Sequence, residues 1–264
     1  MRESISPRST ITLAGSYRFS DFLDNTNTVN ATNTGTVNSH QISGSAGYNR
    51  ILNRFDQVGV SYGYQQFQFP MQGAGSIQSN VFQFLYAHQV SGRMSLILGA
   101  GPQITTVGER NGLPAFSQVS ANIRTSLHYR YPKTLLMLGY DRYTSGGSGL
   151  QLGSHSDVVK AAIQRPLSRL WTSSLDVGYS RHTALQDPGL TSNALGGSFQ
   201  DGYGGGGLTR RLGRFFSLAL HYQYNYEYFG GAACTGGKID CSHSFNRHVG
   251  DVTLSWHPLP IRLD

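Results

Sequence analysis

The sequence contains few charged residues and no long apolar run. Asp, Glu, Lys and Arg make up 13% of its 264 residues, whereas a typical soluble domain has about 25%. No segment approaches the roughly 18 consecutive apolar residues of a membrane-spanning helix, and no signal peptide is recognisable. These absences exclude a helical membrane anchor and predict a surface that is covered by something other than charge.

Cysteine is scarce as well. The two cysteines, Cys234 and Cys241, end the Gly-rich segment C-T-G-G-K-I-D-C. We expect a small disulfide in an oxidising compartment, with two free thiols or half of a metal site as the alternatives. No Cys or His pair has zinc-like spacing, so the sequence predicts neither a metal site nor a cofactor.

Basic clusters are missing although the formal charge is +7. The Lys and Arg residues are scattered singly, without a basic block or an aromatic–basic motif. We therefore expect no nucleic-acid partner.

The most regular stretch runs from Phe215 to Phe229. From Phe216 to Tyr228 every second residue is apolar or aromatic, and the residues between them are small or polar. A period of two gives a strand with two unlike faces. Its roughly 13 residues exceed the usual soluble strand of about 5 to 6 and suit a tilted strand across a bilayer, which needs about 9 to 11.

Twelve segments with this alternation predict twelve strands. Long polar segments follow the odd-numbered strands and short turns follow the even-numbered ones, which predicts a meander with all long loops at one end. The parity changes at Gln65 and Gln66, which predicts a β-bulge, and Pro102 predicts a local irregularity. The predicted strands span about 10–19, 40–50, 57–69, 79–90, 94–107, 119–130, 134–143, 155–165, 171–182, 198–210, 215–229 and 245–256.

The two faces indicate lipid on one side and water on the other. Aromatic residues gather near both ends of the predicted strands, as in the two belts of a membrane-spanning barrel; they include Tyr48, Tyr129, Trp171, Phe216, Tyr226 and Trp256. The opposite face carries charged side chains. A soluble core would not bury such charges without partners, but water in a lumen would solvate them. The candidate pore-lining residues are Arg18, Asn49, Arg124, His128, Lys160, Asp176, His221, Gln223, Asn225 and Glu227.

With this alternation and these connections, the sequence resembles a bacterial outer-membrane β-barrel of the porin-like kind. The resemblance implies an all-β fold: a closed, antiparallel up-and-down transmembrane barrel of about 12 strands, forming one domain over residues 1–264. It also implies long extracellular loops, short periplasmic turns and a place in the outer membrane of a Gram-negative bacterium. Residues 1–9 and 257–264 are then periplasmic segments.

The same resemblance implies membrane lipid and the barrel assembly machinery as partners. In such proteins the last strand carries a polar-x-Gly-x-x-aromatic-x-aromatic signal. Here His248 and Gly250 match its start, whereas Val252, Leu254 and Trp256 fall one place away from the expected slots. The match is partial.

The predicted function is a channel for small polar solutes. Twelve strands enclose a wider interior than eight, and the basic excess of the inner set predicts a mild anion preference. Acidic residues in the same set also predict salt-bridged packing that competes with conduction. The alternative is a surface anchor, adhesin or receptor barrel with a plugged lumen.

A membrane hydrolase with a site at the rim is a further alternative. No Gly-x-Ser-x-Gly motif is present, so the sequence predicts no enzymatic activity. Two acid or nucleophile groups within hydrogen-bond reach of one histidine near the loops would favour an enzyme. The histidines and acids there are His40, His155, His182, His243, His248, Asp157, Asp187 and Asp201.

Overall fold

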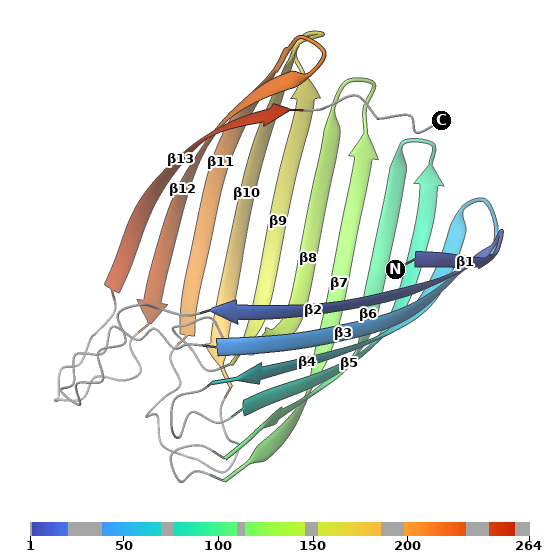
Figure 1. The fold of residues 1–264 in the computed structure, drawn as a ribbon, viewed down its shortest axis with the longest axis vertical. Coiled ribbons are helices and arrows are strands. Elements are labelled where there is room, and N and C mark those ends of the chain that lie inside the picture. The colour runs from blue at the N-terminus through green and yellow to red at the C-terminus, as the bar shows by residue number, and fades with distance from the viewer. Residues whose placement is uncertain are drawn as a thin grey trace, which may run out of the picture.

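The chain forms a single antiparallel sheet of 13 strands, in which each strand pairs with its neighbours in sequence (Figure 1). The structure is a computed structural model that describes residues 2–20, 39–69, 76–109, 114–145, 153–185, 198–230 and 243–256. The strands are β1 (Arg2–Ser6), β2 (Ser9–Ser20), β3 (Ser39–Ile51), β4 (Asp56–Gln68), β5 (Ser76–Ser91), β6 (Met94–Val107), β7 (Phe116–Arg130), β8 (Leu135–Ser145), β9 (Ser154–Pro166), β10 (Trp171–Ala184), β11 (Ser198–Leu212), β12 (Phe216–Gly230) and β13 (His243–Trp256).

The twelve predicted strands are confirmed as β2 to β13, with differences only at their ends. The short strand β1 was not predicted, because the five residues of Arg2–Ser6 are too few to establish a period. Most residues of the predicted loops, both cysteines and residues 257–264 lie outside the described residues. No helix in the described ranges has the length and apolar character needed to cross a bilayer.

Short turns join the strands at one end of the sheet, which we call the turn end; the opposite end is the loop end. The turn before β4 is held by Asn53, whose side-chain oxygen accepts the backbone N–H groups of Phe55 and Asp56 at 2.7 and 2.8 Å. The turn between β11 and β12 contains Gly213 at a φ of +84°, a conformation that L-residues with a side chain rarely adopt. Local turn chemistry therefore fixes these hairpins.

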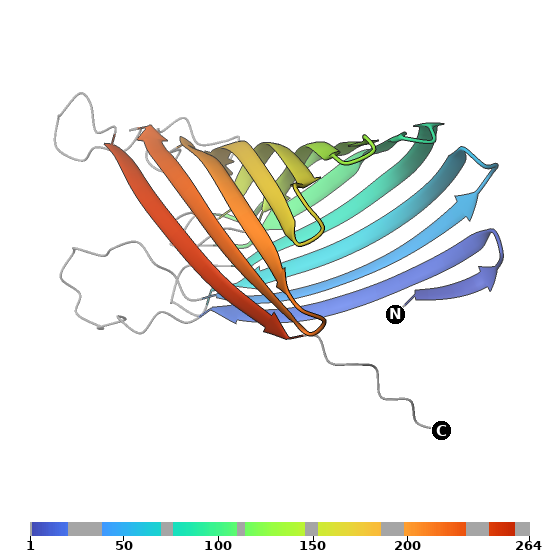
Figure 2. The same ribbon diagram turned by 90° about the horizontal axis from the view of Figure 1, so that it is seen from above.

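The sheet is open, which differs from the predicted closed barrel. Among the described residues, β13 pairs with β12 and β1 pairs with β2, and the strand order has two free ends. One physical reason is that β1 occupies the edge of β2 from Ser9 to Thr12, where the last strand of a closed barrel would pair. The sheet nevertheless curls strongly, with β2–β5 running across the direction of β7–β13 (Figures 1 and 2).

Contacts between distant strands show which face lies inside the curl. Ile77 of β5 and Leu185, just after β10, both lie within 3 Å of the position that a Cβ on Gly153 would take. Gly153 and Leu185 adjoin the paired strands β9 and β10, whereas β5 is a neighbour of neither strand. The sheet is therefore folded toward itself on the face that carries Ile77. We call it the inner face.

An apolar row crosses the inner face at the loop end. Phe67, Ile77, Val107 and Phe116 are successive cross-strand partners on β4 to β7, and they pack with Phe69 and Leu185. This row explains the parity change in β4. The predicted β-bulge at Gln65 and Gln66 is wrong, since both residues stay in continuous register with β3 and β5; the apolar residues change face while the backbone does not.

The outer face is apolar and exposed. Phe84, Val119 and Val252 are 69%, 69% and 71% exposed, and the register places all three opposite the polar set. A soluble monomer rarely exposes so broad an apolar surface. The outer face therefore suits contact with lipid.

Gly153 provides a test of the contact across the curl. It has a φ of +84°, like Gly213, but a methyl group at Gly153 would lie 2.9 Å from Ile77 Cδ1, across the curl, and 2.6 Å from Leu185 Cδ1, whereas at Gly213 it would meet nothing within 4 Å. We expect Gly153→Ala to lower the free energy of unfolding by about 1–3 kcal/mol more than Gly213→Ala, because overpacking adds to backbone strain. Urea titration in lipid vesicles, followed by tryptophan fluorescence, measures both. Equal losses would show that the packing around Gly153 does not support the fold.

Candidate functional site

All ten candidate pore-lining residues lie on the inner face by register. Their cross-strand partners share this face, as in the direct pairs of Arg124 with Asp141, Asp176 with Gly205 and His221 with Asp251. Arg18 and Asn49 lie on β2 and β3, whereas the remaining eight lie on β7, β9, β10 and β12. That these residues line a conducting pore stays a prediction.

The centre of the inner face carries two cations around one carboxylate. Arg124 Nε donates to Asp141 Oδ1 at 3.1 Å, and Lys160 Nζ donates to Asp141 Oδ2 at 2.9 Å. The Arg124 and Lys160 side chains are 65% and 56% exposed, whereas that of Asp141 is 17% exposed. Gly139 leaves room for the Lys160 stem, since a Cβ there would lie 3.0 Å from Lys160 Cε. The group has an excess of one positive charge on accessible atoms, and it is the salt-bridged packing that the sequence predicted.

A second polar pair lies further along the sheet. His221 Nε2 is 3.2 Å from Asp176 Oδ1, and Gln223 donates to Asn225 at 2.7 Å. Both contacts join residues that the sequence placed on one face. They bring together four members of the predicted set.

A polar cavity of about 440 Å³ lies on the inner face between β2–β5 and β6–β8. Hydroxyl and amide side chains line much of its wall, and Arg124 adds the charge. Such a wall can solvate a small polar solute without selecting one shape. The polar lining residues include Ser16, Ser43, Ser45, Ser61, Gln65, Gln83, Gln103, Asn122, Arg124 and Thr144.

Gln103 closes one side of this cavity with a fully used side-chain amide. Its nitrogen donates to Ser79 Oγ at 2.6 Å and to the Thr144 carbonyl at 2.8 Å. Its oxygen accepts the Thr144 N–H at 2.9 Å and Asn122 Nδ2 at 3.1 Å. The regular β7–β8 ladder ends at Arg142, so the buried Gln103 side chain takes the place of a partner on β7 for Thr144, which pairs with His155 of β9 on its other side.

Beyond Gln103 the inner face is packed rather than hollow. The apolar row and a set of buried hydroxyl groups, which includes Ser79, Thr105, Ser154 and Ser156, occupy the loop end. Among the parts that the structure describes, the buried side chains of the inner face therefore gather at this end.

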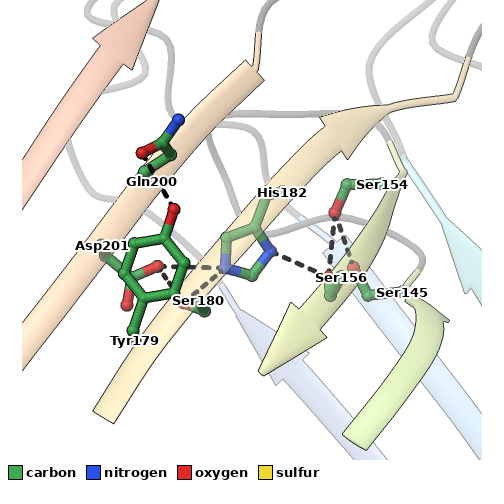
Figure 3. A network of polar contacts seen from close by, with 8 residues as sticks. All are labelled: Ser145, Ser154, Ser156, Tyr179, Ser180, His182, Gln200 and Asp201. Atoms are coloured by element: carbon green, nitrogen blue, oxygen red, sulfur yellow. Dashed lines mark hydrogen bonds and ion pairs between the residues drawn. The ribbon is translucent and has the colours of Figure 1, made fainter. Parts of the chain in front are cut away.

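A hydrogen-bonded network surrounds His182 at this end (Figure 3). His182 Nδ1 is 2.8 Å from Ser156 Oγ, and Nε2 is 3.0 Å from both Asp201 Oδ1 and Ser180 Oγ. Ser180 also donates to Asp201. The network joins β9, β10 and β11, and it can hold or move a proton between a hydroxyl group and a carboxylate.

The other histidines near the loops have simpler surroundings. His40 contacts the Tyr17 hydroxyl at 2.8 Å, His155 contacts Thr144 Oγ1 at 2.9 Å, and His248 contacts the Tyr222 hydroxyl at 2.7 Å. Asp187 lies outside the described residues. Sequence reasoning named His182 and Asp201 but missed Ser156, Ser180 and Gln103, because serine and glutamine on a polar face carry no distinctive signal.

The aromatic residues proposed for the belts lie on the outer face by register. Tyr48 pairs with Val60, Tyr226 pairs with Gly202, and Phe216 pairs with Trp256. At the turn end, Trp171 stacks under the Arg210 guanidinium at 5.2 Å, and Tyr129 makes an edge contact with Tyr131 at 5.0 Å.

Solved structures share this fold. The FrpB iron transporter from Neisseria meningitidis (F3-3 variant) aligns with a TM-score of 0.51 and 9% identity over 95% of this chain. Its F5-1 variant in the apoprotein form gives 0.50 and 11% over the same share. By fold, the chain resembles a Gram-negative outer-membrane β-barrel, in agreement with the sequence analysis. It spans 53% and 54% of the two FrpB chains.

Sequence comparison adds no family to this result. No protein-family model matches the chain, and no curated protein matches it.

Gln103 generates a prediction about stability. We expect Gln103→Leu to lower the free energy of unfolding by about 1–3 kcal/mol for each buried partner left unsatisfied, with the Thr144 backbone contributing most. The control is Gln83→Leu, since among the described residues the Gln83 side chain makes one hydrogen bond, at 3.1 Å to Asn122. Urea titration of both variants in vesicles gives the comparison, and a loss at Gln103 no larger than at Gln83 would contradict the role described.

Proposed function

We propose that the chain is an outer-membrane channel for small polar solutes with a mild preference for anions. The observation that carries this proposal is the inner face, where a polar cavity of about 440 Å³ adjoins the accessible cations Arg124 and Lys160. The excess positive charge attracts anions, while the hydroxyl and amide groups of the wall can also solvate neutral solutes.

The channel requires a closed wall, so the proposal includes closure in the membrane. Hydrocarbon offers no hydrogen bonds to an open sheet edge, and each unsatisfied backbone group there costs several kcal/mol. The free edge of β13 is therefore expected to pair with the edge of β2 once the outer face is in lipid, and β1 must then leave the stretch from Ser9 to Thr12. The apolar, exposed outer face also supports a location in the membrane.

The packed loop end limits what can pass. The row of Phe67, Ile77 and Val107 with Leu185 is buried, and an apolar constriction resists water and ions. This feature favours small solutes over large ones. It also favours the second candidate, a receptor or anchor barrel whose interior is plugged at that end.

Recordings in planar bilayers distinguish the two candidates. A channel produces discrete conductance steps and a reversal potential shifted toward anions in a salt gradient. Protein that is folded, as shown by its β-sheet circular dichroism, but does not raise the conductance above that of the empty bilayer would support the plugged barrel.

The charged centre predicts how selectivity changes. We expect Arg124→Gln to reduce the anion-to-cation permeability ratio by about twofold and Asp141→Asn to raise it by a similar factor, because each changes the local charge by one unit. The control is Arg142→Gln, since Arg142 lies on the outer face in the same part of β8. The assignment of the pore would be wrong if the control shifted the reversal potential as much as Arg124→Gln does.

Closure predicts resistance to detergent. A sheet with every backbone group paired should resist SDS without heating and run on a gel at a different position from the heated sample. Vesicle-folded protein that unfolds in cold SDS, and so runs at one position with or without heating, would count against closure.

A further inference from the structure

We propose that Ser156, His182 and Asp201 form a hydrolytic site for carboxylic esters at the loop end of the inner face. The sequence predicted no enzymatic activity, but the condition that would favour an enzyme is met at His182, which has a carboxylate and two hydroxyl groups within 3.0 Å. This inference goes beyond the channel function and does not depend on it.

The two ring nitrogens of His182 have different partners. An ionised Asp201 can only accept, so Nε2 carries the proton and donates to Oδ1 at 3.0 Å. Nδ1 is then the unprotonated nitrogen and accepts the hydroxyl proton of Ser156 at 2.8 Å. A hydroxyl group on one nitrogen and a carboxylate on the other is the arrangement that activates a serine nucleophile.

Strand register positions these groups. Ser156 and Phe199 are the direct cross-strand partners of His182 on its two sides, and Ser180 is the partner of Asp201. Phe199 stacks on the imidazole at 4.2 Å with an interplanar angle of 11°. The His182 side chain is 16% exposed. Three neighbouring strands thus hold the base in one orientation, which is what a preorganised site requires.

The proposed reaction is acyl transfer to serine followed by hydrolysis. The Ser156 hydroxyl passes its proton to His182 Nδ1 while Oγ forms a bond to the ester carbonyl carbon. The tetrahedral intermediate breaks its bond to the alkoxy group, which leaves as an alcohol with the proton from Nδ1. Water then attacks the acyl-serine with His182 as base, and the carboxylic acid departs as Ser156 regains its proton. Asp201 stays ionised and positions the ring.

A hydroxyl chain lies on the other side of the nucleophile. Ser154 Oγ is 3.5 Å from Ser156 Oγ, and Ser145 Oγ is 3.0 Å from Ser154 Oγ (Figure 3). These groups supply O–H donors close to the carbon that Ser156 would attack. They are the described candidates for stabilising the developing oxyanion.

The surroundings indicate an ester with an apolar acyl chain. Gly153 directly precedes Ser154, and a Cβ at Gly153 would lie within 3 Å of Leu185 and Ile77 of the apolar row. Ser156 is 0% exposed, so an ester reaches it only when side chains of the loop end separate. An acyl chain can replace the apolar contacts that are lost, whereas a charged solute cannot.

The experiment uses a fluorophosphonate probe on the full chain, both in detergent micelles and folded into vesicles. We expect one covalent label, which peptide mass spectrometry locates on Ser156, and hydrolysis of p-nitrophenyl butyrate by the unlabelled protein. Ser156→Ala and His182→Gln should abolish labelling and hydrolysis. Asp201→Asn should lower the hydrolysis rate by about 10²–10⁴-fold, because the carboxylate sets the tautomer.

The matched control is Ser79→Ala. Ser79 is 2% exposed at the same end of the inner face, but its hydroxyl contacts Gln103 and Thr105 rather than a histidine. This variant should keep full labelling, and a purely structural role for the network predicts the same behaviour for Ser79→Ala and Ser156→Ala. Mapping the label on the unmodified protein tests the proposal even if none of the variants folds. Folded protein that takes no label on Ser156 in either environment would overturn the proposal.

Discussion

The backbone ladder between neighbouring strands is the constraint on which the rest of the structure depends. Its register decides which side chains share a face, since a slip of one residue would exchange the two faces of a strand. Across β2 to β13 it keeps the belt aromatics on one side and the polar set on the other. The charged centre, the cavity and the His182 network all follow from that separation.

Much of this fold could be predicted from the sequence, because a period of two is a strong signal over long strands. The strand positions, the short turns and the two faces depend on local alternation, and β2 to β13 agree with the prediction. The open edge could not be read in this way, since alternation is the same in a closed and an open sheet. The five residues of β1 were too short to register as a period.

The candidate site was predictable only in part. The charges of residues such as Arg124 and Lys160 indicate a polar face. Their shared contact with Asp141, however, depends on which strands are neighbours and in what register they pair. The predicted bulge at Gln65 and Gln66 was wrong because an apolar residue on the polar face, here Phe67, resembles a break in the backbone pattern. The curl brings Ile77 and Gly153 together across the sheet, and no local pattern encodes such a contact.

Two residues, Thr144 and Gly153, fix the loop ends of β8 and β9. Thr144 is bound through its backbone to Gln103, and Gly153 is bound through its carbonyl to the N–H of Leu185 at 3.1 Å. The loop end of β8 is thus tied to β6, which is not its neighbour in the sheet, and the loop end of β9 is tied to the residue that follows β10. The pair β8 and β9 is therefore held from both sides at the loop end.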